Sequence, residues 1–315
     1  MNENSQAIII LCSHLCPPEG IDPLSISEWS KVAETLMNHK LEPKDLLDFT
    51  EYEIDSLFAE IKDVTSERLM RLMDRSAGLF AEVSRYKSEG INIYTRADKE
   101  YPVKLKMKLK QKCPPLFYCA GDISISELRV AGYAGSREID SDDEDFTRKT
   151  VMKTCAYKLG VVSGGAKGVD SISAQTALDE GMPLIEYIAG GLTAMLKKKD
   201  IRGNVIKGKR LILSEVNPEA GFSVGSAMSR NKYIYAQSEA AVIIKSDLGN
   251  GGTWTGAAEN IKHGWTKLFC RDKDYPGNME LIRMGAIAIN EDWNGDISIE
   301  NEKRHGQLFI FTGDD

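Results

Sequence analysis

The sequence has few of the side chains that carry metal or nucleophilic chemistry. Only four histidines and six cysteines occur among 315 residues. No two cysteines form a Cys-x-x-Cys pair, so we expect reduced thiols rather than a disulfide framework. Cys12, His14 and Cys16 offer three crowded ligands and no second cluster completes a zinc site. We therefore predict no metal, no cofactor and no catalytic residues.

Long apolar runs are also lacking. The longest one near the start, residues 7–12, is far shorter than the roughly 20 residues of a membrane-spanning helix. No Lys or Arg precedes Lys31, so the basic start of a secretory signal is missing. These absences predict a cytoplasmic protein that does not enter a membrane.

The net charge of −7 is unevenly distributed. Residues 1–85 hold 8 Lys+Arg against 16 Asp+Glu, whereas residues 86–315 hold 32 against 31. Basic side chains gather at residues 104–112 and again at residues 197–210. Such clusters can attract anions under a negative total charge, although two solvated surfaces are an equal alternative on composition alone.

The pattern of apolar residues divides the chain near residue 85. Residues 1–85 predict a small acidic helical domain. Its helices begin at Ser25, at Pro43, and at Thr65 or Ser66, with the last one continuing past Val83. From residue 86 to 315, short β-branched or aromatic runs alternate with helical stretches. Strands are expected at 91–94, 116–118, 129–134, 161–162, 184–188, 211–213, 241–244 and 267–269, and helices at about 142–159, 169–181, 229–237 and 253–264. This alternation predicts an α/β fold whose parallel sheet is covered on both faces.

Four of the expected strands are followed by glycine-bearing loops. These loops are Gly135-Ser136-Arg137, residues 163–170, Ala189-Gly190-Gly191 and residues 249–255. Glycine lets backbone N–H groups converge on an anion, and the helix that follows adds its dipole. With Arg137 and Lys167 inside the loops, a phosphate-bearing ligand is favoured over ordinary turn chemistry. Residues 203–210 only approximate a phosphate-loop motif, because Arg210 replaces its Ser or Thr and a strand follows.

Several of these motifs resemble the DNA-processing protein A family, also called DprA or Smf. Tyr101-Pro102 and residues 114–118 resemble the first conserved segment of the family domain. Gly135-Ser136-Arg137 resembles the family's Gly-[Ser/Thr]-Arg turn. Residues 163–170 resemble its Ser-Gly-x-Ala-x-Gly-[Ile/Val]-Asp loop, and Arg230-Asn231-Lys232 resembles its Arg-Asn-Arg stretch. The resemblance runs from about residue 86 to 295. It implies an extended Rossmann-like, doubly wound and mainly parallel sheet.

The resemblance also implies a function. Family members bind single-stranded DNA, load a RecA-type recombinase onto it, act as homodimers and are not enzymes. The DNA- or phosphate-binding residues would be Gly135, Ser136, Arg137, Ser163, Gly164, Gly165, Lys167, Gly168, Arg230, Asn231, Lys232, Gly251, Gly252 and Thr255. From the residues themselves, we expect Arg230 and Asn231 to start a helix that faces the glycine loops. Arg137 and Arg230 could instead pair with Asp170 or Glu215.

The sequence also departs from the family pattern. Residues 196–210 are unusually basic, and residues 251–256 are only loosely similar to the corresponding family loop. The 20 residues after position 295 are too few for the winged-helix domain of many members. The pathway therefore stays open between transformation, repair and defence. The alternatives are a nucleotide-binding sensor or nucleotide-processing enzyme, and an adaptor that docks through its acidic helices.

Overall fold

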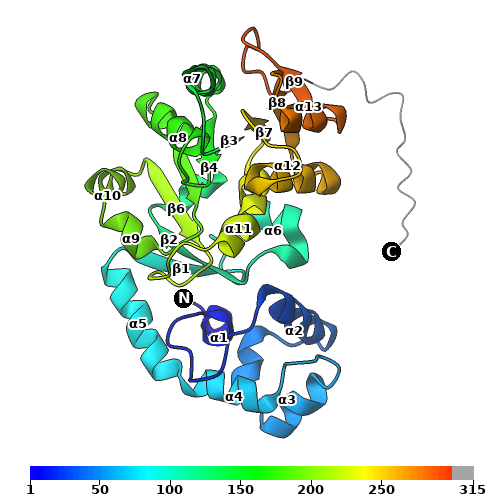
Figure 1. Cartoon of the computed structure of the whole chain (residues 1–315). Helices are drawn as coiled ribbons and strands as arrows, with labels where there is room; N and C mark the ends of the chain where they lie inside the picture. The colour runs from blue at the N-terminus through cyan, green and yellow to red at the C-terminus, as the bar shows by residue number, and fades with distance from the viewer. Residues whose placement is uncertain (300–315) are drawn as a thin grey trace.

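Nine strands form one sheet in the computed structural model, which describes residues 1–299 (Figure 1). The order across the sheet is β1-β2-β6-β5-β4-β3-β7-β8-β9. The neighbours from β6 to β9 are parallel, and β2 runs antiparallel to both β1 and β6. The strands are β1 (Ile91–Thr95), β2 (Leu116–Ala120), β3 (Val130–Ala134), β4 (Gly160–Ser163), β5 (Leu184–Tyr187), β6 (Arg210–Ser214), β7 (Ala240–Ile243), β8 (Lys267–Arg271) and β9 (Ile287–Ile289).

Helices cover both faces of the sheet. They are α6 (Val103–Leu109), α7 (Ser141–Ala156), α8 (Val169–Asp179), α9 (Leu192–Leu196), α10 (Lys199–Ile206), α11 (Val224–Gln237), α12 (Gly251–His263) and α13 (Pro276–Arg283), with 3₁₀ turns η2 (Lys110–Lys112) and η3 (Ile123–Glu127). Along β7, Ala240 and Val242 join the core under α7 and α8, whereas Ala241 and Ile243 join the core under α11 and α12. This alternation with both faces buried is typical of a doubly wound sheet. The predicted fold class is confirmed.

The N-terminal helices lie below the sheet in Figure 1. They are α1 (Glu3–Cys12), α2 (Ile26–Asn38), η1 (Pro43–Asp48), α3 (Glu51–Leu57), α4 (Ser66–Asp74) and α5 (Ser76–Ser88). The predicted caps at Ser25 and Thr65 are present, and Ser25 forms a full capping box with Glu28. The predicted long third helix is instead two helices that meet at Arg75. The Arg75 guanidinium turns back to donate to the carbonyls of Ile10, Ser13 and Leu15.

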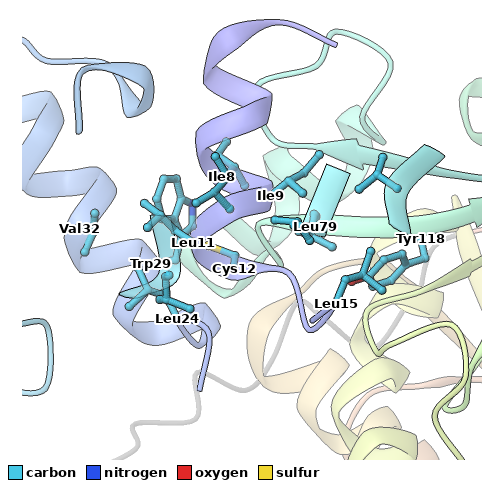
Figure 2. Close-up of a cluster of buried hydrophobic side chains, with 14 of the residues drawn as sticks. Ile8, Ile9, Leu11, Cys12, Leu15, Leu24, Trp29, Val32, Leu79 and Tyr118 are labelled. Atoms are coloured by element: carbon cyan, nitrogen blue, oxygen red, sulfur yellow. The ribbon is translucent and has the colours of Figure 1, made fainter. Parts of the chain in front are cut away.

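Helix α1 joins the N-terminal helices to the sheet. Figure 2 shows Ile8, Ile9 and Leu11 of α1 in the apolar cluster that reaches Tyr118 of β2. Ser13 Oγ lies 2.9 Å from Tyr118 Oη. The same cluster includes buried residues of β1, β6 and α9. The helices therefore share their core with one end of the sheet, and the division into domains 1–85 and 86–315 stays a prediction.

Two further observations concern helices and the end of the chain. Within residues 1–299, no helix combines the length and apolar character needed to cross a membrane.

Helix α11 begins at Val224, five residues before the predicted start, because Ser223 caps its first turn. The prediction that no winged-helix domain follows position 295 concerns residues that lie largely outside the described range.

Candidate functional site

A cavity of about 700 Å³ opens at the carboxyl ends of β3 and β7. These two neighbouring strands mark the point where the chain changes direction across the sheet, since β4 to β6 lie on one side and β8 and β9 on the other. Ligands of doubly wound proteins bind at such a switch point. The wall comes from the loops after β3 and β7, the start of α8 and the first three turns of α11.

Eight of the predicted site residues line this cavity. They are Gly135, Ser136, Arg137, Arg230, Asn231, Gly251, Gly252 and Thr255. The loop after β7 supplies the N-terminus of α12, where Asn250 makes no side-chain cap. Asn231 Nδ2 donates to the carbonyl of Gly252 at 2.9 Å and so ties α11 to this loop. The exposed Thr255 hydroxyl donates to Gly251 of the preceding turn.

The loop after β4 packs against the loop after β3, which lines the cavity. Gly168 has φ +73°, and a Cβ there would lie 2.4 Å from the carbonyl oxygen of Ser136. A side chain would therefore push the two loops apart. Gly164 and Ser163 are buried, and Ser163 Oγ has no hydrogen-bond partner in the described part of the chain. Gly165 and Lys167 are exposed beside the cavity but do not line it.

Arg230 is the unusual residue of the site. Its side chain is only 7 % exposed, and its Nε and Nη1 have no hydrogen-bond partner within residues 1–299. The nearest carboxylate, Asp170, lies 4.0 Å from Nη2 and already accepts from the backbone N–H groups of Gly164 and Ala166. Burial lowers the pKa of Arg230, and burial raises the pKa of Asp170 against the opposing charge of Arg230. The wall of the cavity thus holds a desolvated guanidinium with unused donors.

The position of Arg230 depends on Gly164. A Cβ at Gly164 would lie 1.3 Å from Arg230 Nη1, so only glycine leaves room for the guanidinium. Arg230 lies in the second turn of α11, whereas the sequence predicted that it starts a helix. Its side chain still reaches the glycine loops as expected.

Two more cations lie at the mouth of the cavity. Arg137 is exposed, lies 5.2 Å above the Phe222 ring, and has no ion-pair partner among the described residues. The predicted alternative pairing with Asp170 or Glu215 is therefore not observed for Arg137, whereas Arg230 does pair with Asp170, at the long distance of 4.0 Å. Lys245 lies two residues after the end of β7, donates to the carbonyl of Glu138 at 3.0 Å and lies 3.6 Å from Asp143 Oδ2.

The sequence did not single out several residues of the cavity wall. Phe222, Val224 and Met228 line it while exposing 59 %, 68 % and 46 % of their surface. They come from the segment before α11 and from its first turns, which carry no motif. Lys245 could have been found, because it follows a core strand just as the loop of Arg137 does.

Some predicted elements lie elsewhere. Lys232 is on α11, but its ammonium lies over the Tyr233 ring and not in the cavity. The loop Ala189-Gly190-Gly191 packs against Pro218 and Ala220 instead of lining the cavity.

Three carboxylates gather at the start of α7. Their oxygens, from Asp140, Asp142 and Asp143, lie within 4.8 Å of one another. Arg271 donates to Asp142 and Asp143 at 2.8 Å, and Lys273 donates to Asp142 at 2.7 Å. These cations balance the cluster, so we assign it a structural role.

Comparisons with known proteins agree on one family. The family model described as DNA recombination-mediator protein A matches residues 92–296. DNA processing protein DprA of Bacillus subtilis is 26 % identical over 215 residues, which is 66 % of this chain and 71 % of that protein. The Streptococcus pneumoniae protein of the same name is 25 % identical over 143 residues, or 45 % of this chain and 50 % of that protein.

The fold has the same relatives. The X-ray structure of DNA processing protein A from S. pneumoniae matches with a TM-score of 0.72 and 19 % identity, over 92 % of this chain and 95 % of that one. The Helicobacter pylori protein, whose structure is described in terms of its single-stranded DNA binding mode, matches with a TM-score of 0.52 and 22 % identity. That match covers 64 % of this chain and 92 % of that one.

Proposed function

The chain belongs to the DNA recombination-mediator protein A family, and from this premise we propose that its cavity binds the backbone of single-stranded DNA. The observation that carries the proposal is Arg230, a buried cation whose Nε and Nη1 lack partners. Buried guanidinium donors without acceptors are costly even with the Asp170 carboxylate 4.0 Å away, and an anion in the cavity would lower that cost. The guanidinium offers a planar pair of donors that suits phosphate oxygens.

The surroundings of Arg230 favour a phosphate over other anions. The first residues of α12 line the same cavity without a side-chain cap on their N–H groups, and glycines on two loops leave the backbone open to close approach. Arg137 and Lys245 add positive charge at the mouth. The phosphodiester backbone supplies such anions in a regular series.

The rim favours a single strand over a duplex. Phe222 is exposed with the Arg137 guanidinium over one face of its ring, and Val224 and Met228 extend the apolar surface. Unpaired bases stack on aromatic and guanidinium planes, whereas bases in a duplex are already stacked. We infer binding that is largely indifferent to base sequence.

We further propose that this chain shares the partner, the oligomeric state and the non-catalytic role that its family resemblance implies. These are the loading of a RecA-type recombinase onto the bound strand, action as a homodimer, and a binding role without catalysis. The support is membership of the recombination-mediator family and the similarity to the H. pylori protein, whose structure concerns single-stranded DNA binding. Binding of DNA in the cavity is the step on which the others depend.

Paired variants test the role of Arg230. Asp170→Asn removes a negative charge beside the phosphate while an amide oxygen can still accept from Gly164 and Ala166. The affinity for an oligothymidylate should then stay equal or rise. Adding Arg230→Met to this variant removes the guanidinium without leaving a buried carboxylate alone. We expect a loss of roughly ten- to hundredfold in affinity, the equivalent of about 1.5–3 kcal/mol for one charge-assisted bond.

Fluorescence anisotropy and thermal unfolding on the same preparations provide the measurement. A folded double variant that binds DNA as tightly as Asp170→Asn would refute the role of Arg230.

A further inference from the structure

The two lysine-rich segments of the sequence differ in what their cations contact. In the first segment, around α6, four of the five ammonium groups, those of Lys104, Lys106, Lys108 and Lys112, contact other parts of the chain. Lys104 donates to the carbonyl of Leu128 and Lys108 to that of Ser238, both at 2.8 Å, and Lys106 donates to that of Arg96 at 2.9 Å. These hydrogen bonds attach α6 to the residues that follow η3, β1 and α11, so the ammonium groups stabilise the fold.

The cations of the second segment are not engaged in this way. We call it the α10 surface and define it as Lys197, Lys198, Lys199, Arg202, Lys207 and Lys209. All six side chains are exposed, and within residues 1–299 none of them makes an ion pair or a hydrogen bond. Asp200 is the one carboxylate among them. Arg210 does not belong to this set, because it is buried and pairs with Glu186 at 2.7 Å.

The α10 surface begins beside the rim of the cavity. Gly191 N–H donates to the carbonyl of Ala220 at 2.8 Å, and Thr193 N–H to that of Pro218 at 2.9 Å. These bonds attach the start of α9 to the segment that carries Phe222. Helix α9 has five residues, about 8 Å at 1.5 Å per residue, so Lys197–Lys199 follow closely. Figure 1 shows α9 and α10 together along one side of the sheet.

We propose that the α10 surface is a second contact for the DNA strand held in the cavity. The DNA strand would pass over Phe222 and continue along α9 to the lysines. This proposal rests on the proposed function of the cavity. The composition of the surface favours a nucleic-acid backbone over an acidic protein. Protein interfaces have apolar cores poor in lysine, whereas Ile206 is the one large apolar side chain exposed between residues 192 and 210. Exposed unpaired lysines are typical of contacts that work by release of counterions.

Two DNA lengths separate this contact from the cavity. A short oligothymidylate of roughly six nucleotides fills the cavity alone, and one of roughly 30 nucleotides reaches the α10 surface as well. In the full chain, Lys197→Ala with Lys198→Ala and Lys199→Ala should leave the affinity for the short strand unchanged. The same variant should weaken binding of the long strand by tenfold or more. Its slope of log affinity against log salt should become less steep by about 2, at 0.7 per lost contact.

Two control variants sharpen the comparison. Lys31→Ala with Lys62→Ala and Lys87→Ala removes three exposed lysines from α2, from the turn before α4 and from α5. This variant should bind both strands as the wild type does, or less strongly by the same small factor. Asp200→Asn removes the carboxylate from the surface. It should bind the long strand roughly two- to threefold more tightly at low salt, as expected for one charge at about 8 Å in water.

The outcomes distinguish failure of this inference from failure of the cavity proposal. If the wild type binds neither strand, the proposed function itself is wrong. If it binds both strands and the α10 variant matches the lysine control, the α10 surface does not contact DNA. Unchanged DNA binding together with a smaller assembly mass by light scattering would assign the surface to the acidic helices of a second copy, and would also overturn the inference.

Discussion

At the scale of single residues, Gly164 and Arg230 form a dependent pair. Gly164→Ala would place a Cβ 1.3 Å from Arg230 Nη1 and displace the guanidinium. We expect a loss of roughly tenfold or more in DNA affinity, because one charge-assisted contact is misplaced. The loss of DNA affinity should exceed the loss that a smaller fraction of folded protein would cause.

Gly78→Ala in α5 is the matched control for this change. A Cβ there meets nothing within 4 Å, so it should leave binding intact and stabilise the helix by about 0.5–1 kcal/mol. Equal DNA affinity of the two alanine variants would contradict the dependence of Arg230 on Gly164.

The exposed cations Arg137 and Lys167 make a second prediction at this scale. Either change to Ala should alter the free energy of unfolding by only about 0.5 kcal/mol, since both side chains are exposed. The affinity for single-stranded DNA should fall roughly ten- to hundredfold for each lost phosphate contact. Arg137→Glu should be worse than Arg137→Ala because repulsion is added.

Anisotropy titrations over a range of salt measure these effects, and the double alanine variant should also flatten the salt dependence. A folded double variant with unchanged affinity would remove both residues from the site. The two residues differ in position, because Arg137 lines the cavity whereas Lys167 lies beside it. We therefore expect the larger effect at Arg137.

The sequence predicted some of these residues for a physical reason. Arg137 and Gly135 follow a core strand, and the carboxyl ends of parallel strands meet at one edge, so their place in the cavity could be inferred from order alone. Phe222 and the lack of partners at Arg230 could not be inferred. Both depend on how the start of α11 packs over distant loops, which no local pattern encodes.

At the scale of elements, strands were easier to predict than short helices. All eight predicted strands are present, and the parallel ones among them, β3 to β8, are short and almost fully buried apolar runs. The ninth, β9, has three residues and was missed. Helix α1 was also missed since it is apolar on nearly every side and therefore has no amphipathic period. Helices α9 and α10 have only five and eight residues, and α10 carries charge in place of a clear apolar stripe.

Lys108 of α6 predicts a pH dependence of stability. Burial lowers its pKa to about 8, with a further contribution from the nearby charge of Lys104. An unfolded lysine titrates near 10.4, so between about pH 8 and 10.4 the unfolded chain binds more protons than the folded one. The free energy of unfolding from this group should therefore rise with pH across that window.

Urea unfolding of the wild type and of Lys108→Met would measure this contribution. The stability difference, wild type minus variant, should increase from pH 8 to 10. Parallel stability profiles for the wild type and Lys108→Met would show that Lys108 keeps its proton in the folded protein.

At the scale of the whole molecule, the charge is divided between two regions. The acidic residues 1–85 lie against the β1 and β2 end of the sheet, whereas the cavity and the α10 surface expose unpaired cations. A negative total charge is therefore compatible with binding a polyanion, since the local field and not the sum guides the ligand. Because α1 shares its core with the sheet, the acidic helices also stabilise the part that carries the cavity.

The most direct test of the account is the choice of ligand in solution. Anisotropy of a labelled oligothymidylate, competed by a thymidine mononucleotide and by duplex DNA over a range of salt, separates a DNA-binding protein from a nucleotide sensor. We predict that the single strand binds most tightly and that the mononucleotide competes weakly. Log affinity should fall against log salt with a slope of roughly −2 to −4, as for three to six phosphate contacts. Saturating competition by the mononucleotide, tighter binding of the duplex, or a flat salt dependence would contradict it.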